Sequence, residues 1–206
     1  MIAVIDYGMG NIKSVVNALL YLGEDVAVTA DPKKIGDASH IILPGVGAFG
    51  KAMSNLEKLG MVDILDDQVI KKGKPFLGIC LGLQLLAKSS HEHGEHSGLG
   101  WIDGDVRKFN IDDAKLKLPH MGWNEIVPKT EHPVFGHLKD DQYTFYFVHN
   151  YHIECNDPGD IAATCSYGYE FPAVICRDNI IATQFHPEKS QDNGIQFLEN
   201  FVEWEQ

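Results

Sequence analysis

Residues 75–86 read Pro75-Phe76-Leu77-Gly78-Ile79-Cys80-Leu81-Gly82-Leu83-Gln84-Leu85-Leu86, in which two apolar runs flank a Gly-x-Cys-x-Gly core. This pattern is typical of a nucleophile on a sharp strand-to-helix turn, where the backbone is strained and the flanking positions lie against neighbouring backbone. Glycine fits those positions because it has no Cβ. At a helix start, peptide dipoles favour the reactive thiolate of Cys80. We therefore interpret Cys80 as a nucleophile in preference to a small apolar core residue.

The first half of the chain alternates short apolar runs with segments of helical periodicity. Repeated strand–helix units of this kind predict a parallel sheet with helices on both faces and right-handed crossovers. The expected strands are residues 2–5, 26–29, 41–43 and 76–80, and the expected helices are residues 11–22, 49–59 and 62–70.

From Trp101 onward the expected strands lie closer together and are separated by turns, which indicates antiparallel hairpins added to the sheet or laid on its edge. They are residues 106–109, 125–127, 143–148, 161–165, 173–176 and 180–185. A last helix is expected over residues 192–204, with Ser190 as its cap. No linker or repeat divides the chain, so we expect one domain over residues 1–206.

Composition excludes several classes of function. The chain has 206 residues, 44% hydrophobic content and a formal charge of −12, which argues against nucleic-acid and anionic-membrane partners. No secretory signal or membrane-spanning run is expected. The four cysteines form no C-x-x-C pair, so a metal site lacks support, and Cys155, Cys165 and Cys176 are expected in the core. A reactive thiol and the missing signal predict a reducing, cytoplasmic location.

A cysteine nucleophile requires a base, and His186 is the best candidate. It follows the expected strand over residues 180–185, and the carboxyl edge of an open α/β sheet is where sites form. Glu188 lies two residues further on, and Pro187 fixes the backbone between them. We therefore expect Glu188 to orient His186 in a Cys-His-Glu arrangement. The alternative is a loop histidine beside a surface glutamate.

The glycine-rich turn Pro44-Gly45-Val46-Gly47-Ala48-Phe49-Gly50 also follows a strand. Backbone N–H groups of such a turn can bind a developing oxyanion. We expect the N–H of Val46 or Gly47 to act together with that of Leu81. The alternative is a tight connecting loop without a catalytic role.

Two other stretches resemble binding motifs without satisfying them. The run from Asp6 to Asn11 lacks the third glycine of a dinucleotide loop, since Lys13 stands there, so NAD is excluded and no cofactor is expected. That stretch remains a candidate for a loop facing a partner. The histidine-rich run from His91 to His96 is interpreted as a mobile polar loop.

The motifs around Cys80, Gly45 and His186 together resemble the class I, or triad, glutamine amidotransferases. Further stretches resemble one branch of that family, the glutaminases that supply ammonia for making imidazole glycerol phosphate in histidine biosynthesis. These are Asp6-Tyr7-Gly8-Met9-Gly10-Asn11, Pro119-His120-Met121-Gly122-Trp123-Asn124, Phe147-Val148-His149-Asn150-Tyr151 and Gln184-Phe185-His186-Pro187-Glu188-Lys189-Ser190. The resemblance covers the chain nearly end to end and implies a flavodoxin-like fold.

The resemblance also implies what the site residues do. Cys80 forms a glutamyl thioester, His186 shuttles the proton, and Glu188 orients His186. The residues implied to hold L-glutamine are Gly47, Gln84, Asn150 and Tyr151. Ammonia passes to a separate cyclase subunit, a (β/α)8 barrel, in a heterodimer that activates the glutaminase. The residues implied at this interface are Asn11, Trp123 and Lys189, and a core position remains an equal alternative for Trp123.

Three rival functions remain open. The nearest is another triad glutaminase, feeding guanylate, anthranilate or pyridoxal phosphate synthesis. A second is a thiol hydrolase on a similar sheet, such as a γ-glutamyl hydrolase or a cysteine dienelactone hydrolase. A third is a binding subunit without catalysis. The segments around Trp123 and Asp6 favour the histidine pathway over the first two, and the complete set of Cys80, His186 and Glu188 argues against the third.

Overall fold

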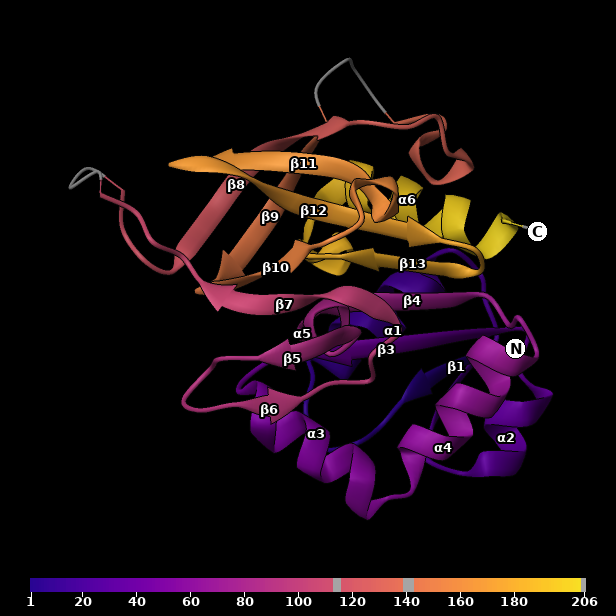
Figure 1. Ribbon diagram of the computed structural model, residues 1–206. Coiled ribbons are helices and arrows are strands. Elements are labelled where there is room, and N and C mark those ends of the chain that lie inside the picture. Colours follow the sequence, from indigo (N-terminus) through magenta and orange to yellow (C-terminus); the bar gives the residue numbers. More distant parts are fainter. Residues whose placement is uncertain (113–115, 139–142, 205–206) are drawn as a thin grey trace.

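The computed structural model describes residues 1–112, 116–138 and 143–204 of the chain (Figure 1). A nine-stranded sheet runs through its centre. Its strands lie in the order β2 (Val26–Thr29), β1 (Ile2–Ile5), β3 (His40–Gly45), β4 (Phe76–Cys80), β13 (Ile180–Thr183), β12 (Tyr169–Arg177), β11 (Ile161–Tyr167), β8 (His120–Pro128) and β9 (Thr144–His149). The five strands from β2 to β13 are parallel, and the remaining four continue the sheet antiparallel.

Side chains alternate between two cores, one on each face of this sheet, as expected for strands that are covered on both sides. Val4 packs into the core that includes residues of α1 (Ile12–Tyr21) and α6 (Gln191–Glu203). Ile5 packs into the opposite core with α2 (Pro32–Asp37), α3 (Phe49–Lys58) and α4 (Met61–Leu65). A second, four-stranded sheet closes that face, in the order β10 (Tyr151–Cys155), β7 (Ile102–Lys108), β5 (Ala87–Ser90) and β6 (His96–Ser97).

The predicted α/β class, with a mostly parallel sheet, helices on both faces and added antiparallel strands, is confirmed. Three details of the prediction are wrong. The single helix expected over residues 62–70 is α4 followed by a π-helical turn, Asp66–Lys71. Ser190 occupies the cap position of α6 but its hydroxyl does not cap the helix, because it donates to the His186 carbonyl and accepts from the Tyr146 N–H. The sequence reading also missed α2, β5, β6 and β10.

The register of the parallel strands brings the site together. Gly45 at the end of β3 lies opposite Cys80 at the end of β4, and Thr183 of β13 lies opposite Ile79. The segments after β3, β4 and β13 therefore leave the sheet at one edge. This is the edge where open α/β sheets place their sites.

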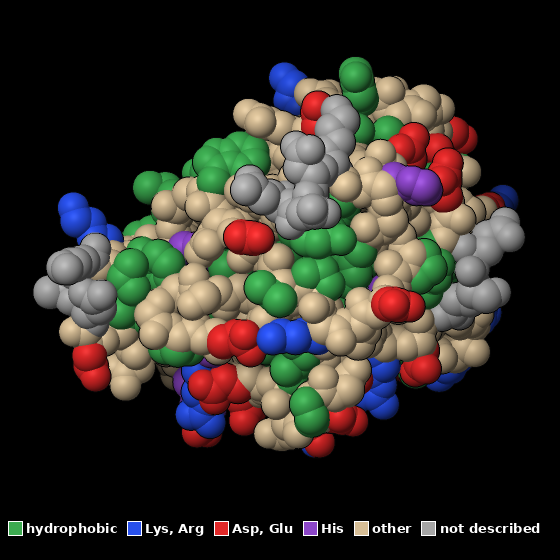
Figure 2. Space-filling model, turned by 90° about the horizontal axis from the view of Figure 1, so that it is seen from above, with side chains coloured by type: hydrophobic (Ala, Val, Ile, Leu, Met, Phe, Trp, Pro, Cys, Tyr) green, Lys and Arg blue, Asp and Glu red, His purple; other side chains and the backbone are tan. Residues whose placement is uncertain are grey.

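The surface seen from above in Figure 1 carries several hydrophobic patches, with acidic and basic side chains scattered among and around them (Figure 2). The negative net charge is thus not gathered into one acidic patch on this face. Within the described residues, no helix has the length and apolar character needed to cross a membrane.

Candidate active site

Cys80 lies at the turn between β4 and the one-turn helix α5 (Leu81–Gln84). Its backbone has φ +55° and ψ −103°, a region that side chains with a Cβ rarely adopt. Both flanking glycines are required by close backbone approach: a Cβ on Gly82 would overlap the Leu43 carbonyl oxygen, and one on Gly78 would lie 2.9 Å from the Gly82 carbonyl. Because α5 is only one turn long, its dipole stabilises the thiolate of Cys80 less than the sequence analysis predicts.

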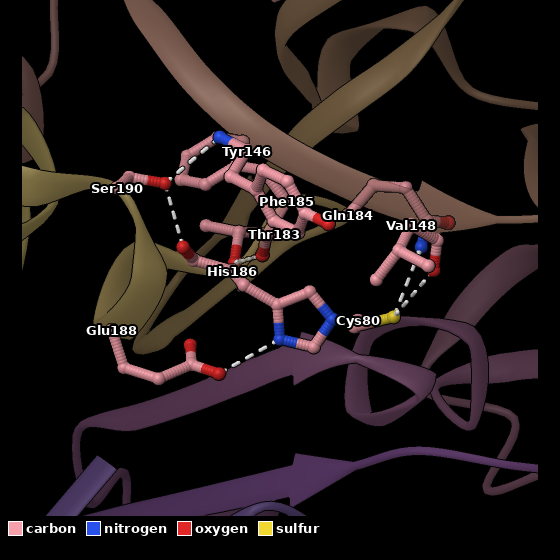
Figure 3. A network of polar contacts seen from close by, with 9 residues as sticks. All are labelled: Cys80, Tyr146, Val148, Thr183, Gln184, Phe185, His186, Glu188 and Ser190. Carbon is pink, nitrogen blue, oxygen red and sulfur yellow. Dashed lines mark hydrogen bonds and ion pairs between the residues drawn. The ribbon is translucent and has the colours of Figure 1, made fainter. Parts of the chain in front are cut away.

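His186 follows β13 and turns its ring toward Cys80 (Figure 3). Its Nδ1 lies 2.8 Å from Oε1 of Glu188, and the two side chains are 2% and 1% exposed. A carboxylate accepts only, so Nδ1 carries the proton. Nε2 faces Cys80 and has no hydrogen-bond partner among the described residues. The ring therefore presents one nitrogen toward the thiol and holds the other on a buried acid.

Electrostatics favour the protonated form of His186. Burial alone lowers the pKa of this imidazole, but the negative charges of Cys80 and Glu188, together with the hydrogen bond to Glu188, outweigh burial and raise its pKa to about 10. A pKa shifted by burial and by specific charged partners is typical of a functional site.

A cavity of about 470 Å³ opens beside Cys80. That volume fits a small polar metabolite. Every residue predicted to form the oxyanion site or to hold glutamine lines this cavity, and His186 lines it as well. The predicted residues are Val46, Gly47, Leu81, Gln84, Asn150 and Tyr151.

Gln84 is held firmly in the wall of this cavity. It is 6% exposed, and its Nε2 donates to the Tyr151 carbonyl at 2.9 Å and to Oε1 of Gln184 at 3.1 Å. Both hydrogens of the amide are thus used inside the protein. The oxygen of Gln84 is consequently the atom of this side chain that remains available to a ligand.

Glu92 also lines the cavity, and the sequence reading missed it. Its carboxylate accepts from the Phe49 N–H at the start of α3, directly after the glycine-rich turn. The segment from His91 to His96, predicted to be a mobile polar loop, therefore packs against that helix, and the ring of His96 lies over Gly50. Within the described part of the chain, no group of three or more His, Cys, Asp or Glu side chains is arranged to hold a metal ion.

The three residues predicted at a partner interface lie on different elements near the site. Asn11 precedes α1, and Lys189 is in the 3-10 turn Pro187–Lys189, where its N–H donates to the His186 carbonyl. Trp123, on β8, is 48% exposed, so the alternative of a core position is wrong. Its ring meets that of Tyr146, whose carbonyl accepts from the His186 N–H. The structure thus links Lys189 directly, and Trp123 through Tyr146, to the backbone of His186.

A strained cysteine, a buried His-Glu pair and a cavity of about 470 Å³ at the carboxyl edge of a flavodoxin-like sheet define a thiol-dependent acyl-transfer enzyme. Comparison with known proteins makes the class specific. Residues 3–204 match the family model "Glutamine amidotransferase class-I", and the chain belongs to this family.

Two similar relatives are both named as HisH subunits of imidazole glycerol phosphate synthase. The chain is 50% identical over 206 residues to imidazole glycerol phosphate synthase subunit HisH of Geobacter sulfurreducens, covering 98% of both proteins. It is 48% identical over 207 residues to subunit HisH 2 of Nitrobacter winogradskyi, again covering 98% of both. Among solved structures, PurLQS from Thermotoga maritima shares the fold, with a TM-score of 0.75 at 17% identity over 98% of this chain and 96% of that chain.

Proposed function

We propose that this chain is the glutaminase subunit of an imidazole glycerol phosphate synthase, which hydrolyses L-glutamine and delivers ammonia to a cyclase subunit in histidine biosynthesis. Relatives named HisH, which are 48% and 50% identical to this chain and cover 98% of it, support the pathway. The single observation that supports the chemistry is the ring of His186, which is held by buried Glu188, faces Cys80 and lines with it a cavity of about 470 Å³. The alternative function, a binding subunit without catalysis, does not explain this arrangement.

The proposed reaction uses these residues in order. The thiolate of Cys80 attacks the side-chain carbonyl carbon of glutamine, and the N–H of Leu81 with that of Val46 or Gly47 binds the oxyanion. The C–N bond breaks as His186 gives its proton to the leaving nitrogen, which departs as ammonia. Water then loses a proton to His186 and attacks the thioester, the C–S bond breaks, and glutamate leaves with the thiolate restored.

The cavity wall supports glutamine as the substrate. The free oxygen of Gln84 and the carboxylate of Glu92 are acceptors suited to an α-ammonium group. Gly47, Asn150 and Tyr151 line the same space and complete the proposed glutamine subsite. Neither a cofactor nor a metal takes part in this proposal.

Exposed hydrophobic side chains near the cavity support a protein partner. Val46 lines the cavity and is 38% exposed, and on the β8 side Met121 is 63% exposed next to Trp123. Apolar side chains left in contact with water in this way are typical of a surface that another subunit covers. We propose that this surface, with Asn11, Trp123 and Lys189, docks the (β/α)8 cyclase in a heterodimer, with neither nucleic acid nor membrane as a partner.

Two broader assignments belong to the same proposal. The chain from residue 1 to residue 206 forms one glutamine amidotransferase domain. The enzyme acts in the cytoplasm, where a reducing environment preserves the thiol of Cys80, and the four cysteines are free thiols in the structure.

The test is the Cys80→Ala variant assayed with a cyclase subunit and its ligand. We expect glutamine hydrolysis to disappear, because the nucleophile is gone, while the complex still makes imidazole glycerol phosphate from added ammonium. Alanine at Cys176, a half-buried cysteine remote from the cavity lining, is the matched control and should retain both activities. Glutamine hydrolysis that survives in Cys80→Ala would refute the proposal.

A further inference from the structure

Gln184 is a fully buried polar residue that touches the sulfur without lining the cavity. It follows β13, is 0% exposed, and lies two residues before His186. Its Nε2 is 3.7 Å from the sulfur of Cys80, and its Oε1 is 3.1 Å from Nε2 of Gln84. It is absent from the residues that surround the cavity. Gln184 therefore does not contact a ligand in the cavity and can act on it only through Cys80 and Gln84.

The hydrogen bonds around it allow one orientation of each amide. The Tyr151 carbonyl can only accept, so the Gln84 atom 2.9 Å away is the nitrogen. That nitrogen also donates to Gln184, which must therefore present its oxygen to Gln84. The nitrogen of Gln184 is left to face the sulfur, as Figure 3 shows.

The sulfur has two close partners of opposite character. The Val148 carbonyl, 4.0 Å away, can accept from a thiol but repels a thiolate. The Gln184 N–H can donate to the sulfur in either state and binds the thiolate more strongly, because hydrogen bonds to an ionised group are the stronger ones. Gln184 therefore opposes the Val148 carbonyl and favours the reactive form.

We propose that Gln184 is a positioning residue that supports the thiolate of Cys80 with one end of its amide and fixes the glutamine-binding orientation of Gln84 with the other. This inference rests on the proposed glutaminase function. Through the first contact Gln184 stabilises the sulfur both as the attacking nucleophile and as the group that leaves when the thioester is hydrolysed. Through the second it keeps the oxygen of Gln84 turned toward the ligand.

Two variants separate these effects. Gln184→Met keeps the length of the side chain and removes the donor, and Gln184→Glu keeps an acceptor for Gln84 but places an acceptor beside the sulfur. The readout is the rate of Cys80 alkylation by iodoacetamide against pH, with the modified cysteine identified by peptide mass. We expect the midpoint to move to higher pH in both variants, with a rate at neutral pH roughly 10- to 100-fold lower, the range of a charge-assisted hydrogen bond.

Steady-state kinetics of the complex with the cyclase complete the test. Gln184→Glu should lower kcat with little change in KM, because Gln84 keeps its anchor, whereas Gln184→Met should lower kcat and raise KM. Gln191→Glu adds the same charge at an exposed position and serves as the control. An unchanged alkylation midpoint in both variants would overturn the inference. Absence of glutamine hydrolysis in the unaltered complex would instead refute the proposed function.

Discussion

A single buried histidine and a buried pair of histidines in this protein are about equally hidden from water but favour different protonation states. His186, at the end of the parallel half of the sheet, is 1% exposed, and its pKa is raised to about 10. His120 and His149, which face each other across β8 and β9 in the antiparallel half, are 2% and 6% exposed. Burial lowers their pKa values to about 4 and about 3.

The difference lies in the partners. His186 has the sulfur of Cys80 and a carboxylate beside it, and each stabilises an imidazolium when it carries its negative charge. His149 donates from Nδ1 to the Tyr151 carbonyl at 2.8 Å and accepts at Nε2 from Nδ1 of His120 at 2.9 Å, so the pair forms a neutral chain. His120 also stacks on Tyr167. Burial penalises charge in both places, and a negative neighbour decides whether a histidine can carry it.

The largest expected effect comes from removing that neighbour. Glu188→Gln keeps the shape and an acceptor for Nδ1 but deletes the charge, so the pKa of His186 should fall toward those of the neutral pair. We expect kcat of the cyclase complex to fall about 10⁴-fold, the loss found when the acidic member of a catalytic triad is replaced by its amide. The measurement is glutamine hydrolysis against pH. Glu154→Gln, at an exposed ion pair with Arg107, is the control, and a loss below threefold for Glu188→Gln would contradict this explanation.

The same contrast shows what sequence can predict. Cys80, the glycine-rich turn and His186 were predictable because each lies directly after an apolar strand, and strand ends meet at one edge by topology alone.

Glu92 was missed because its role depends on a contact with Phe49, 43 residues away. The pairing of His120 with His149 depends on the register of two antiparallel strands, and β5 was missed because Ala87-Lys88-Ser89-Ser90 has no apolar pattern.

The second prediction concerns stability in acid. The unfolded chain takes up protons on His120 and His149 below about pH 6.5, whereas the folded pair resists protonation until about pH 4 and about pH 3. The contribution of these two histidines to the free energy of unfolding should therefore be fully present above pH 6.5 and decrease as the pH falls toward 4, by about 3 kcal/mol for His120 alone. Urea unfolding at pH 7.5, 6 and 5 measures it.

A variant of His120 isolates the cause. In His120→Phe the new ring can keep the stack on Tyr167, but His149 loses a donor, so stability at pH 7.5 should fall by about 1–3 kcal/mol. The dependence on pH should become shallower by about one proton. His91→Gln, at an exposed histidine, should leave the dependence as it is. An equally steep decrease in His120→Phe would mean that other groups cause the acid sensitivity.

The smallest effect on stability is expected on the outer face of the same strand. Trp123 lies three residues after His120 on β8, and its side chain is about half exposed, so Trp123→Ala should change the free energy of unfolding by no more than about 0.5 kcal/mol. Affinity for the cyclase should nevertheless weaken, by about 2 kcal/mol or roughly 30-fold, because aromatic anchors contribute most at interfaces. Titration calorimetry with the cyclase measures this change, and Val127→Ala, also exposed on β8, is the control. Equal binding by Trp123→Ala and the unaltered chain would mean that the partner docks elsewhere. A large loss of stability in Trp123→Ala would mean that the outer face of β8 contributes as much to the stability of the fold as the buried histidine pair does.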